Sequence, residues 1–190
     1  QALRRRGRRK PARRGGGVTG KVLVLLIVVA AVLAGAGMYY LQVYAYYEEV
    51  VPTGSDDVQL TPLNGDTPET ILYEDFRAID ADSSPIRYRA CFTTPTGLGT
   101  LEDIYAPYTG AAPRVAPGWF DCFDAEAIGE DLAEGRAKVF LSQRNLEYGI
   151  DRVVAVTQDG RGYVWHEVND CGDKSYDGSP LDPTCPPREN

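Results

Sequence analysis

A long uncharged apolar run near the N-terminus constrains this chain more than any other feature. Val22 to Leu41 contains twenty residues without a charged side chain. As an α-helix that rises about 1.5 Å per residue, the run would span about 30 Å, the thickness of the hydrocarbon core of a bilayer. Tyrosines, whose rings favour the membrane–water interface, crowd its C-terminal end at Tyr39, Tyr40, Tyr44, Tyr46 and Tyr47. The sequence therefore predicts a transmembrane helix over residues 22–47 with a Tyr-rich interfacial end.

Charge on either side of this run predicts its orientation. Residues 1–21 carry nine basic side chains and no acidic one. Positive residues close to a first span resist translocation, so this arm is expected to be cytoplasmic. The arm is rich in Arg and Gly and has almost nothing to bury, which predicts disorder. Residues 48–190 are then expected in the periplasm, held by a single-pass anchor in the cell inner membrane.

The N-terminus leaves alternatives open. A cleaved signal peptide also combines a basic arm, an apolar run and a small-residue site such as Ala34-Gly35-Ala36. The run and its tyrosines continue past that cut, which favours an anchor. Residues 1–17 can also be an addition to the natural chain, since Val18 to Lys21 would make an ordinary start before a span. We therefore assign the arm no contact with anionic lipid or nucleic acid and prefer orientation by charge alone.

The chain after the run is strongly acidic. From Glu48 onward, 27 acidic residues meet 11 basic ones, a net charge of −16. A surface of this sign repels phosphate, so we exclude nucleic-acid binding. Residues 48–70 are rich in Pro, Gly, Asp and Thr, which predicts a tether. Residues 71–190 are long enough to bury a core and are expected to form one extracytoplasmic domain.

All four cysteines lie after the apolar run: Cys91, Cys122, Cys171 and Cys185. An even number in an oxidising compartment indicates two disulfides, for which three pairings exist. We expect Cys91 to pair with Cys122 and Cys171 with Cys185, because each pair joins neighbours along the chain. The chain has no CxxC spacing, which disfavours a thioredoxin-like redox pair or a zinc site.

Local patterns predict an α+β fold in which an antiparallel sheet is covered by one or two helices. Residues 152–157 and 162–168 are typical strands around the hairpin signal Asp159-Gly160. Residues 138–141 are expected to form another strand, followed by a turn or one helical turn over residues 142–148.

Two helices and one further strand complete the prediction. Residues 98–105 favour a short helix, and Asp124 is a typical N-cap for a second helix that ends at Gly135. Residues 86–93 alternate with the period of a strand, which would place Arg87 and Arg89 on one face.

Few residues are candidates for chemistry. Arg87 and Arg89, with Arg77 near them in sequence, form the only local basic cluster of the acidic part and could bind a carboxylate or phosphate. Pairing with surrounding acids is the simpler interpretation. His166 is the single histidine and lies next to Glu167 on a predicted strand, where adjacent side chains face opposite ways, so a shared metal site is disfavoured.

Recognisable catalytic and cofactor motifs are absent. The sequence has no Gly-rich phosphate loop, no GxSxG and no HExxH. The segment from Asp80 begins like a calcium loop, but Pro85 stands where that loop needs Gly and Cys91 where it needs Glu. We therefore predict no catalytic residue, no cofactor and no metal site.

Four runs resemble an uncharacterised bacterial family of single-span membrane-anchored proteins: GMYYLQVYAYYE from Gly37, ILYEDFRAIDADSSPIRYRACF from Ile71, APGWFDCFDAE from Ala116 and YGIDRVVAVTQDGRGYVWH from Tyr148. The resemblance covers nearly everything after Thr19 and implies no catalytic residue. Members are sometimes loosely labelled histidine kinase. An arm of residues 1–21 is too short for a kinase domain, and His166 is expected outside the cell membrane.

Two functions fit these observations. The first is a non-enzymatic accessory subunit or assembly factor whose acidic domain docks onto a membrane or envelope protein. The second is an envelope ligand-binding module or enzyme that uses the arginine cluster and His166. An enzyme should gather these side chains in one concave pocket, whereas an interaction protein should show an exposed apolar or aromatic patch.

Overall fold

The computed structural model describes residues 20–172, 176, 178 and 185, so most of the predicted arm lies outside the described residues. The chain divides into two compact units, Gln1–Gln42 and Val43–Asn190. The first contains the helix α1 (Gly20–Val43), none of whose side chains is buried. Its mean hydropathy of 2.7 and its 24 residues make it long and apolar enough to cross a membrane. The predicted apolar helix is present and ends four residues before the predicted boundary.

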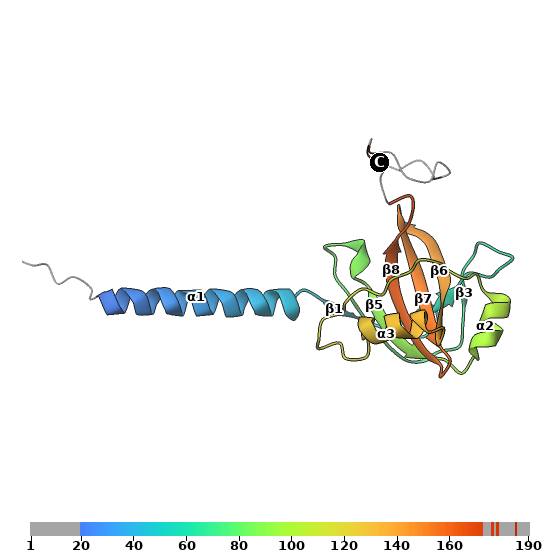
Figure 1. Cartoon of the computed structure of the whole chain (residues 1–190), viewed down its shortest axis with the longest axis horizontal. Coiled ribbons are helices and arrows are strands. Elements are labelled where there is room, and N and C mark those ends of the chain that lie inside the picture. The colour runs from blue at the N-terminus through green and yellow to red at the C-terminus, as the bar shows by residue number, and fades with distance from the viewer. Residues whose placement is uncertain (1–19, 173–175, 177, 179–184, 186–190) are drawn as a thin grey trace, which may run out of the picture. The chain divides into compact units, whose positions relative to one another are not determined.

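An antiparallel six-stranded sheet forms the centre of the second unit (Figure 1). Its strands, in spatial order, are β1 (Glu48–Val50), β4 (Glu74–Asp80), β5 (Arg89–Thr93), β8 (Arg161–Val168), β7 (Ile150–Thr157) and β6 (Ala137–Glu147). A separate ribbon pairs β2 (Gln59–Leu60) with β3 (Glu69–Thr70). The sheet and its helices confirm the predicted α+β class.

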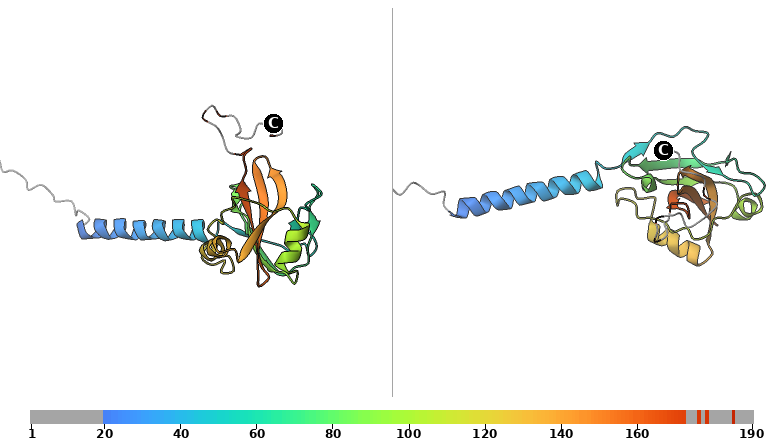
Figure 2. Two further views of the ribbon diagram at one scale, coloured as in Figure 1. Left: turned by 45° about the vertical axis from the view of Figure 1, so that its right-hand side comes forward. Right: turned by 90° about the horizontal axis from the view of Figure 1, so that it is seen from above.

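Both faces of the sheet are covered. Along β7, Val154 and Val156 enter one hydrophobic core, and Val153 and Ala155 enter the other. This alternation is the period-two pattern of a strand with two buried faces. The first core is completed by β2 and by α2 (Leu98–Ile104), and the second by α3 (Ala125–Ala133) and the loop before it. The views in Figures 1 and 2 show α2 and α3 well apart on the domain.

The predicted helix after Asp124 is confirmed as α3. The Asp124 carboxylate accepts hydrogen bonds from the backbone N–H groups of Glu126 and Ala127, which otherwise lack helical partners. Gly135 follows the helix with φ of 73°, a left-handed conformation that glycine adopts without strain. Ile128 is the buried side chain of the helix and packs in the second core.

Replacing Asp124 with alanine is expected to lower the free energy of unfolding by about 1 kcal/mol, because two N–H groups lose their acceptor. Chemical denaturation of the wild type and the variant measures the change. Asp124→Asn should retain most of the stability, since its side-chain oxygen can still accept. Equal losses in both variants would contradict the cap as the cause.

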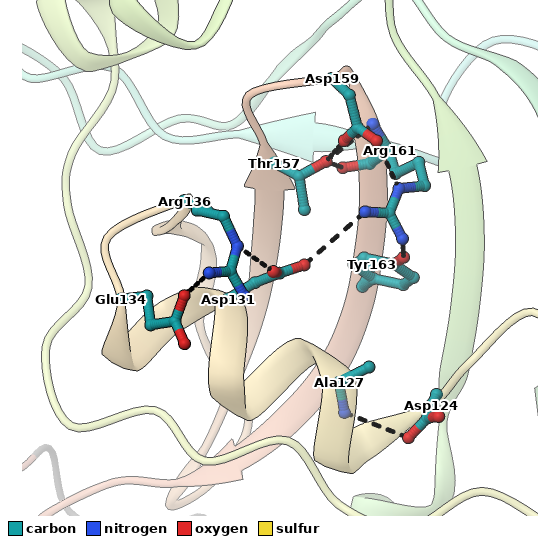
Figure 3. Close-up of polar contacts among 9 residues, drawn as sticks. All are labelled: Asp124, Ala127, Asp131, Glu134, Arg136, Thr157, Asp159, Arg161 and Tyr163. Atoms are coloured by element: carbon teal, nitrogen blue, oxygen red, sulfur yellow. Dashed lines mark hydrogen bonds and ion pairs between the residues drawn. The ribbon is translucent and has the colours of Figure 1, made fainter.

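Ion pairs connect the end of α3 to the turn between β7 and β8 (Figure 3). Asp131 binds Arg136 at 2.7 Å and lies 3.7 Å from Arg161, which also pairs with Asp159 at 2.8 Å. Arg161 also donates to the Tyr163 hydroxyl at 3.1 Å. Both arginines are about half exposed, so each pair stabilises the fold by about 0.2–1 kcal/mol. The network orients the helix against the hairpin without supplying much of its stability.

Two strand boundaries differ from the prediction. β6 continues to Glu147 through the segment predicted as a turn, because pairing with β7 extends from Ala137↔Thr157 to Glu147↔Ile150 with two register shifts. β5 begins only at Arg89, because Pro85 starts a 3₁₀-helix over Pro85–Arg87. Arg87 and Arg89 are therefore on different elements.

Part of the segment predicted as a tether belongs to the folded domain. Val58 and Leu60 are completely buried in the first core. The backbone N–H of Thr61 donates to the carbonyl of Leu141 at 2.9 Å, so this segment also covers part of the edge of β6. Residues 48–70 therefore form strands β1, β2 and β3 of the domain, together with the loops that connect these strands.

The predicted disulfide pairing is confirmed. Cys91 of β5 bonds to Cys122 in the loop before α3, and Cys171 bonds to Cys185. The first bond ties this loop to the sheet, and the second closes a loop over a sequence separation of 14 residues.

Candidate functional site

The most distinctive surface of the domain is the loop over residues 111–123, which we call the braced loop. It precedes α3 and lies over the second core, where its residues Phe120 and Phe123 are buried. Charged side chains from several other elements hold its backbone and side chains.

Arg89 makes the most extensive contacts with this loop. Its Nε donates to the carbonyl of Arg114 at 2.9 Å, and its Nη2 lies 3.5 Å from the carbonyl of Val115. Its Nη1 donates to the carbonyls of Ile86 and Tyr88 at 2.9 and 2.7 Å. The side chain is buried, which lowers the pKa of Arg89 to about 10, so it stays charged at neutral pH.

Glu167 holds the same loop from β8. One carboxylate oxygen accepts hydrogen bonds from the backbone N–H of Ala112 and from the indole N–H of Trp165, both at 2.7 Å. The other oxygen forms an ion pair with Arg114 at 3.2 Å. Glu167 is buried, so these three donors replace the water that its charge would otherwise require.

Arg77 contacts the far end of the braced loop from β4. Its Nη1 lies 3.1 Å from Asp121, and its guanidinium lies 5.5 Å from the centroid of the Phe120 ring. Both partners of the ion pair are more than half exposed. Next to this pair, the Cys91–Cys122 disulfide fixes the loop covalently to β5.

Arg87 reaches the loop through aromatic side chains. Its guanidinium stacks over the Tyr46 ring at 4.9 Å and donates to the Tyr47 hydroxyl at 3.3 Å. Tyr47 in turn packs edge-on against Trp119 of the loop, with ring centroids 6.5 Å apart. The indole N–H of Trp119 donates to the carbonyl of Val43 at 2.6 Å.

The structure thus brings all three predicted arginines to the braced loop or to Tyr46 and Tyr47 beside it. It does not bring them into one anion-binding pocket. Arg89 is occupied by carbonyls, Arg77 by a carboxylate and Arg87 by tyrosines. This arrangement can fix a surface in place. It does not leave a set of free, converging donors for a small ligand.

His166 lies on the opposite face of the sheet from Glu167, as expected for adjacent strand residues. It is buried and stacks on Tyr88, with ring centroids 5.0 Å apart. Its Nε2 accepts from Arg152 Nε at 3.0 Å, and its Nδ1 donates to the carbonyl of Pro85. Burial, with Arg152 and Arg89 nearby, lowers the pKa of His166 to about 4, so the ring is neutral at pH 7.

The candidate residues His166, Arg77, Arg87 and Arg89 do not line a common cavity in the described part of the chain. His166, Arg87 and Arg89 line none of five well-formed surface hollows in this part. Arg77 lines a hollow of about 350 Å³ together with the Cys91–Cys122 disulfide, Arg161 and Tyr163. Among the described residues, no group of three or more His, Cys, Asp or Glu side chains could hold a metal ion.

Sequence reasoning missed Glu167, Arg114 and Trp119 as parts of this arrangement. Glu167 is one of 27 acidic residues, and no local pattern marks it as buried. One signal was available, since residues 111–120 contain no acidic side chain in an otherwise acidic region.

Comparison with known protein families places most of the chain in a family. A family model described as a family of unknown function (DUF6446) matches residues 58–186. This range includes strands β2 to β8, both domain helices and the braced loop. No curated protein and no solved structure matches the chain.

Proposed function

Because the chain belongs to DUF6446, a family without an established function, its role must be argued from its geometry, and we propose that it is a non-enzymatic accessory subunit or assembly factor of a membrane complex. In this proposal α1 is a single-pass anchor in the inner membrane. Its N-terminal arm is cytoplasmic, and residues 48–190 are periplasmic. The domain binds a membrane or envelope protein.

One observation carries the proposal: the side chains best suited to chemistry have structural partners. Arg89 and Glu167 hold the backbone of the braced loop, and His166 is held between Arg152 and Pro85. An enzyme needs such groups next to a space that a substrate can enter. A binding protein needs a surface of fixed shape, which buried charged contacts of this kind provide.

Two further features support the placement. The disulfides are expected to persist in an oxidising compartment such as the periplasm. The strongly acidic composition after the apolar run keeps the domain soluble and disfavours contact with anionic surfaces except where acids are absent.

Affinity purification of the full chain, tagged and at native expression in mild detergent, tests the accessory role. We expect one membrane protein to co-purify at constant stoichiometry, and the reciprocal purification from that protein to recover this chain. A variant in which a cleavable signal sequence replaces α1 is the matched control and should lose most of the partner. Recovery of the bare chain under all these conditions would contradict the proposal.

Thiol counting tests the location independently. Mass spectrometry of the envelope-purified chain should find no free thiol before reduction and four after it. Four free thiols before reduction would place the domain in a reducing compartment.

A ligand-binding module remains the alternative and rests on the hollow beside the disulfide. Its volume of about 350 Å³ lies within the range of small-molecule sites, and Arg77 and Arg161 flank it. The purified chain should then bind a small carboxylate or phosphate in calorimetry, and Arg77→Gln should abolish that binding. The accessory role predicts no such binding.

A further inference from the structure

Most of the braced loop lacks the negative charge that dominates the domain. Residues 111–120 include Arg114 and no acidic side chain, whereas the chain from Glu48 onward has a net charge of −16. An acidic surface is repelled by the anionic head groups of a bilayer. Residues 111–120 therefore carry none of the negative charge that such head groups repel.

The tip of the loop is apolar and exposed. The side chain of Val115 is 81 % exposed, and Ala112 and Gly118 are exposed beside it. Arg89 binds the carbonyls of Arg114 and Val115, and Glu167 binds the backbone of Ala112, so the tip cannot fold back to bury this side chain. Buried charged groups thus hold an apolar side chain in contact with solvent.

Trp119 of the braced loop lies beside the start of the second compact unit. Trp119 donates to the carbonyl of Val43, which is the last residue of α1 and the first of the second compact unit. Tyr46 and Tyr47 follow Val43 within four residues, and Tyr47 packs on Trp119. If α1 crosses the membrane, Trp119 and these tyrosines lie at the level where amphipathic rings favour the head-group layer.

We propose that the braced loop is a lipid-contacting surface, in which Trp119 lies with Tyr46 and Tyr47 in the head-group layer of a phospholipid bilayer and Val115 enters the same layer. The inference rests on the proposed function only in requiring that α1 spans the membrane. Arg89 and Glu167 keep the loop in the shape that presents this surface.

The chain has two tryptophans, which makes a direct test possible. Trp165 is completely buried in the second core, whereas Trp119 is only partly buried. The full chain is reconstituted in nanodiscs whose lipids carry bromine close to the glycerol backbone, and its emission is compared with that in unbrominated lipid. The emission of Trp119 is defined as the part of the signal that Trp119→Phe removes. We expect bromolipid to quench most of this emission and to quench little of the emission of Trp165.

A second variant tests the tip itself. Val115→Trp in the Trp119→Phe background should restore a bromolipid-quenched emission, while Leu72→Trp in that background should not. Leu72 is the matched control, because it is 71 % exposed and lies outside the loop.

The outcomes separate lipid from other occupants. Emission of Trp119 that is quenched by aqueous iodide and not by bromolipid would overturn the proposal. Protection from both quenchers only when a protein co-purifies would also overturn it and assign the loop to that partner. Extraction of the chain from vesicles by carbonate would instead refute the anchor, whereas an integrated chain with unquenched Trp119 would refute the lipid contact alone.

Discussion

Replacing Arg89 with methionine is expected to lower the free energy of unfolding of the domain by about 2–4 kcal/mol, because several backbone carbonyls lose a charged donor and each unsatisfied group costs about 1–3 kcal/mol. Arg89 supplies hydrogen bonds to the carbonyls of Ile86, Tyr88 and Arg114, of which the bond to Tyr88 is buried and the other two are partly buried. Methionine fills much of the volume, so the loss reports on polar contacts more than on packing. Urea unfolding of the full chain in detergent, followed by the emission of the buried Trp165, measures it.

Arg77→Met is the matched control, because Arg77 makes an exposed ion pair at the other end of the braced loop. Its loss should be less than about 1 kcal/mol. Arg89→Lys should be intermediate, since an ammonium cannot reach all the carbonyls that the guanidinium binds. If Arg89→Met unfolds the domain entirely, Arg89→Lys still gives a measurable difference. A loss in Arg89→Lys no larger than in Arg77→Met would show that the buried contacts are not what stabilises the loop.

Elements specified by neighbouring residues could be predicted from the sequence. The hairpin of β7 and β8 is encoded by two apolar strands around Gly160, whose φ of 83° suits glycine. The helix α3 is encoded by its cap Asp124 and by the spacing of its apolar residues. In each case the signal lies within about twenty residues, where propensity and periodicity act.

Elements that depend on distant partners could not be predicted. The second half of β6 lacks a strand pattern of its own and is held by pairing with β7. Val58 and Leu60 look like part of a tether in a Pro- and Gly-rich segment, yet they are buried because Ile71 and Tyr105 surround them in the first core. Tertiary contacts determine the structure of such segments, and the local propensity of their residues does not predict these contacts.

The candidate site was predictable only in part, for the same reason. Alternation suggested that Arg87 and Arg89 share a face, but Pro85 begins a 3₁₀-helix that separates them. Their common role appears only when the fold brings the braced loop, far along the chain, over β5 and β8. Burial of Glu167 also depends on that loop, so no pattern within its own strand distinguishes it from the other acidic residues.

His166 is expected to make the stability of the domain depend on pH between about 4 and 6.5. In the folded domain the pKa of His166 is lowered from 6.5 to about 4, first because the ring is buried and also because Arg152 and Arg89 lie near it. Between these values the unfolded chain binds a proton that the folded chain does not. The free energy of unfolding therefore falls as the pH falls through this range, by up to about 3 kcal/mol, and this contribution does not change further below about pH 4.

Comparison with His166→Gln isolates this contribution from that of the many carboxylates. The glutamine side chain does not titrate, and its oxygen can still accept from Arg152. The stability difference between wild type and variant should be constant above about pH 7 and should shrink or reverse as the pH falls to about 4. Since His166 is the single histidine of the chain, its ring signals in NMR give the folded pKa without assignment. A midpoint near 6.5, or parallel stability curves for the two proteins, would show that the ring is accessible to water and that its contacts with Arg152 and Pro85 do not persist in solution.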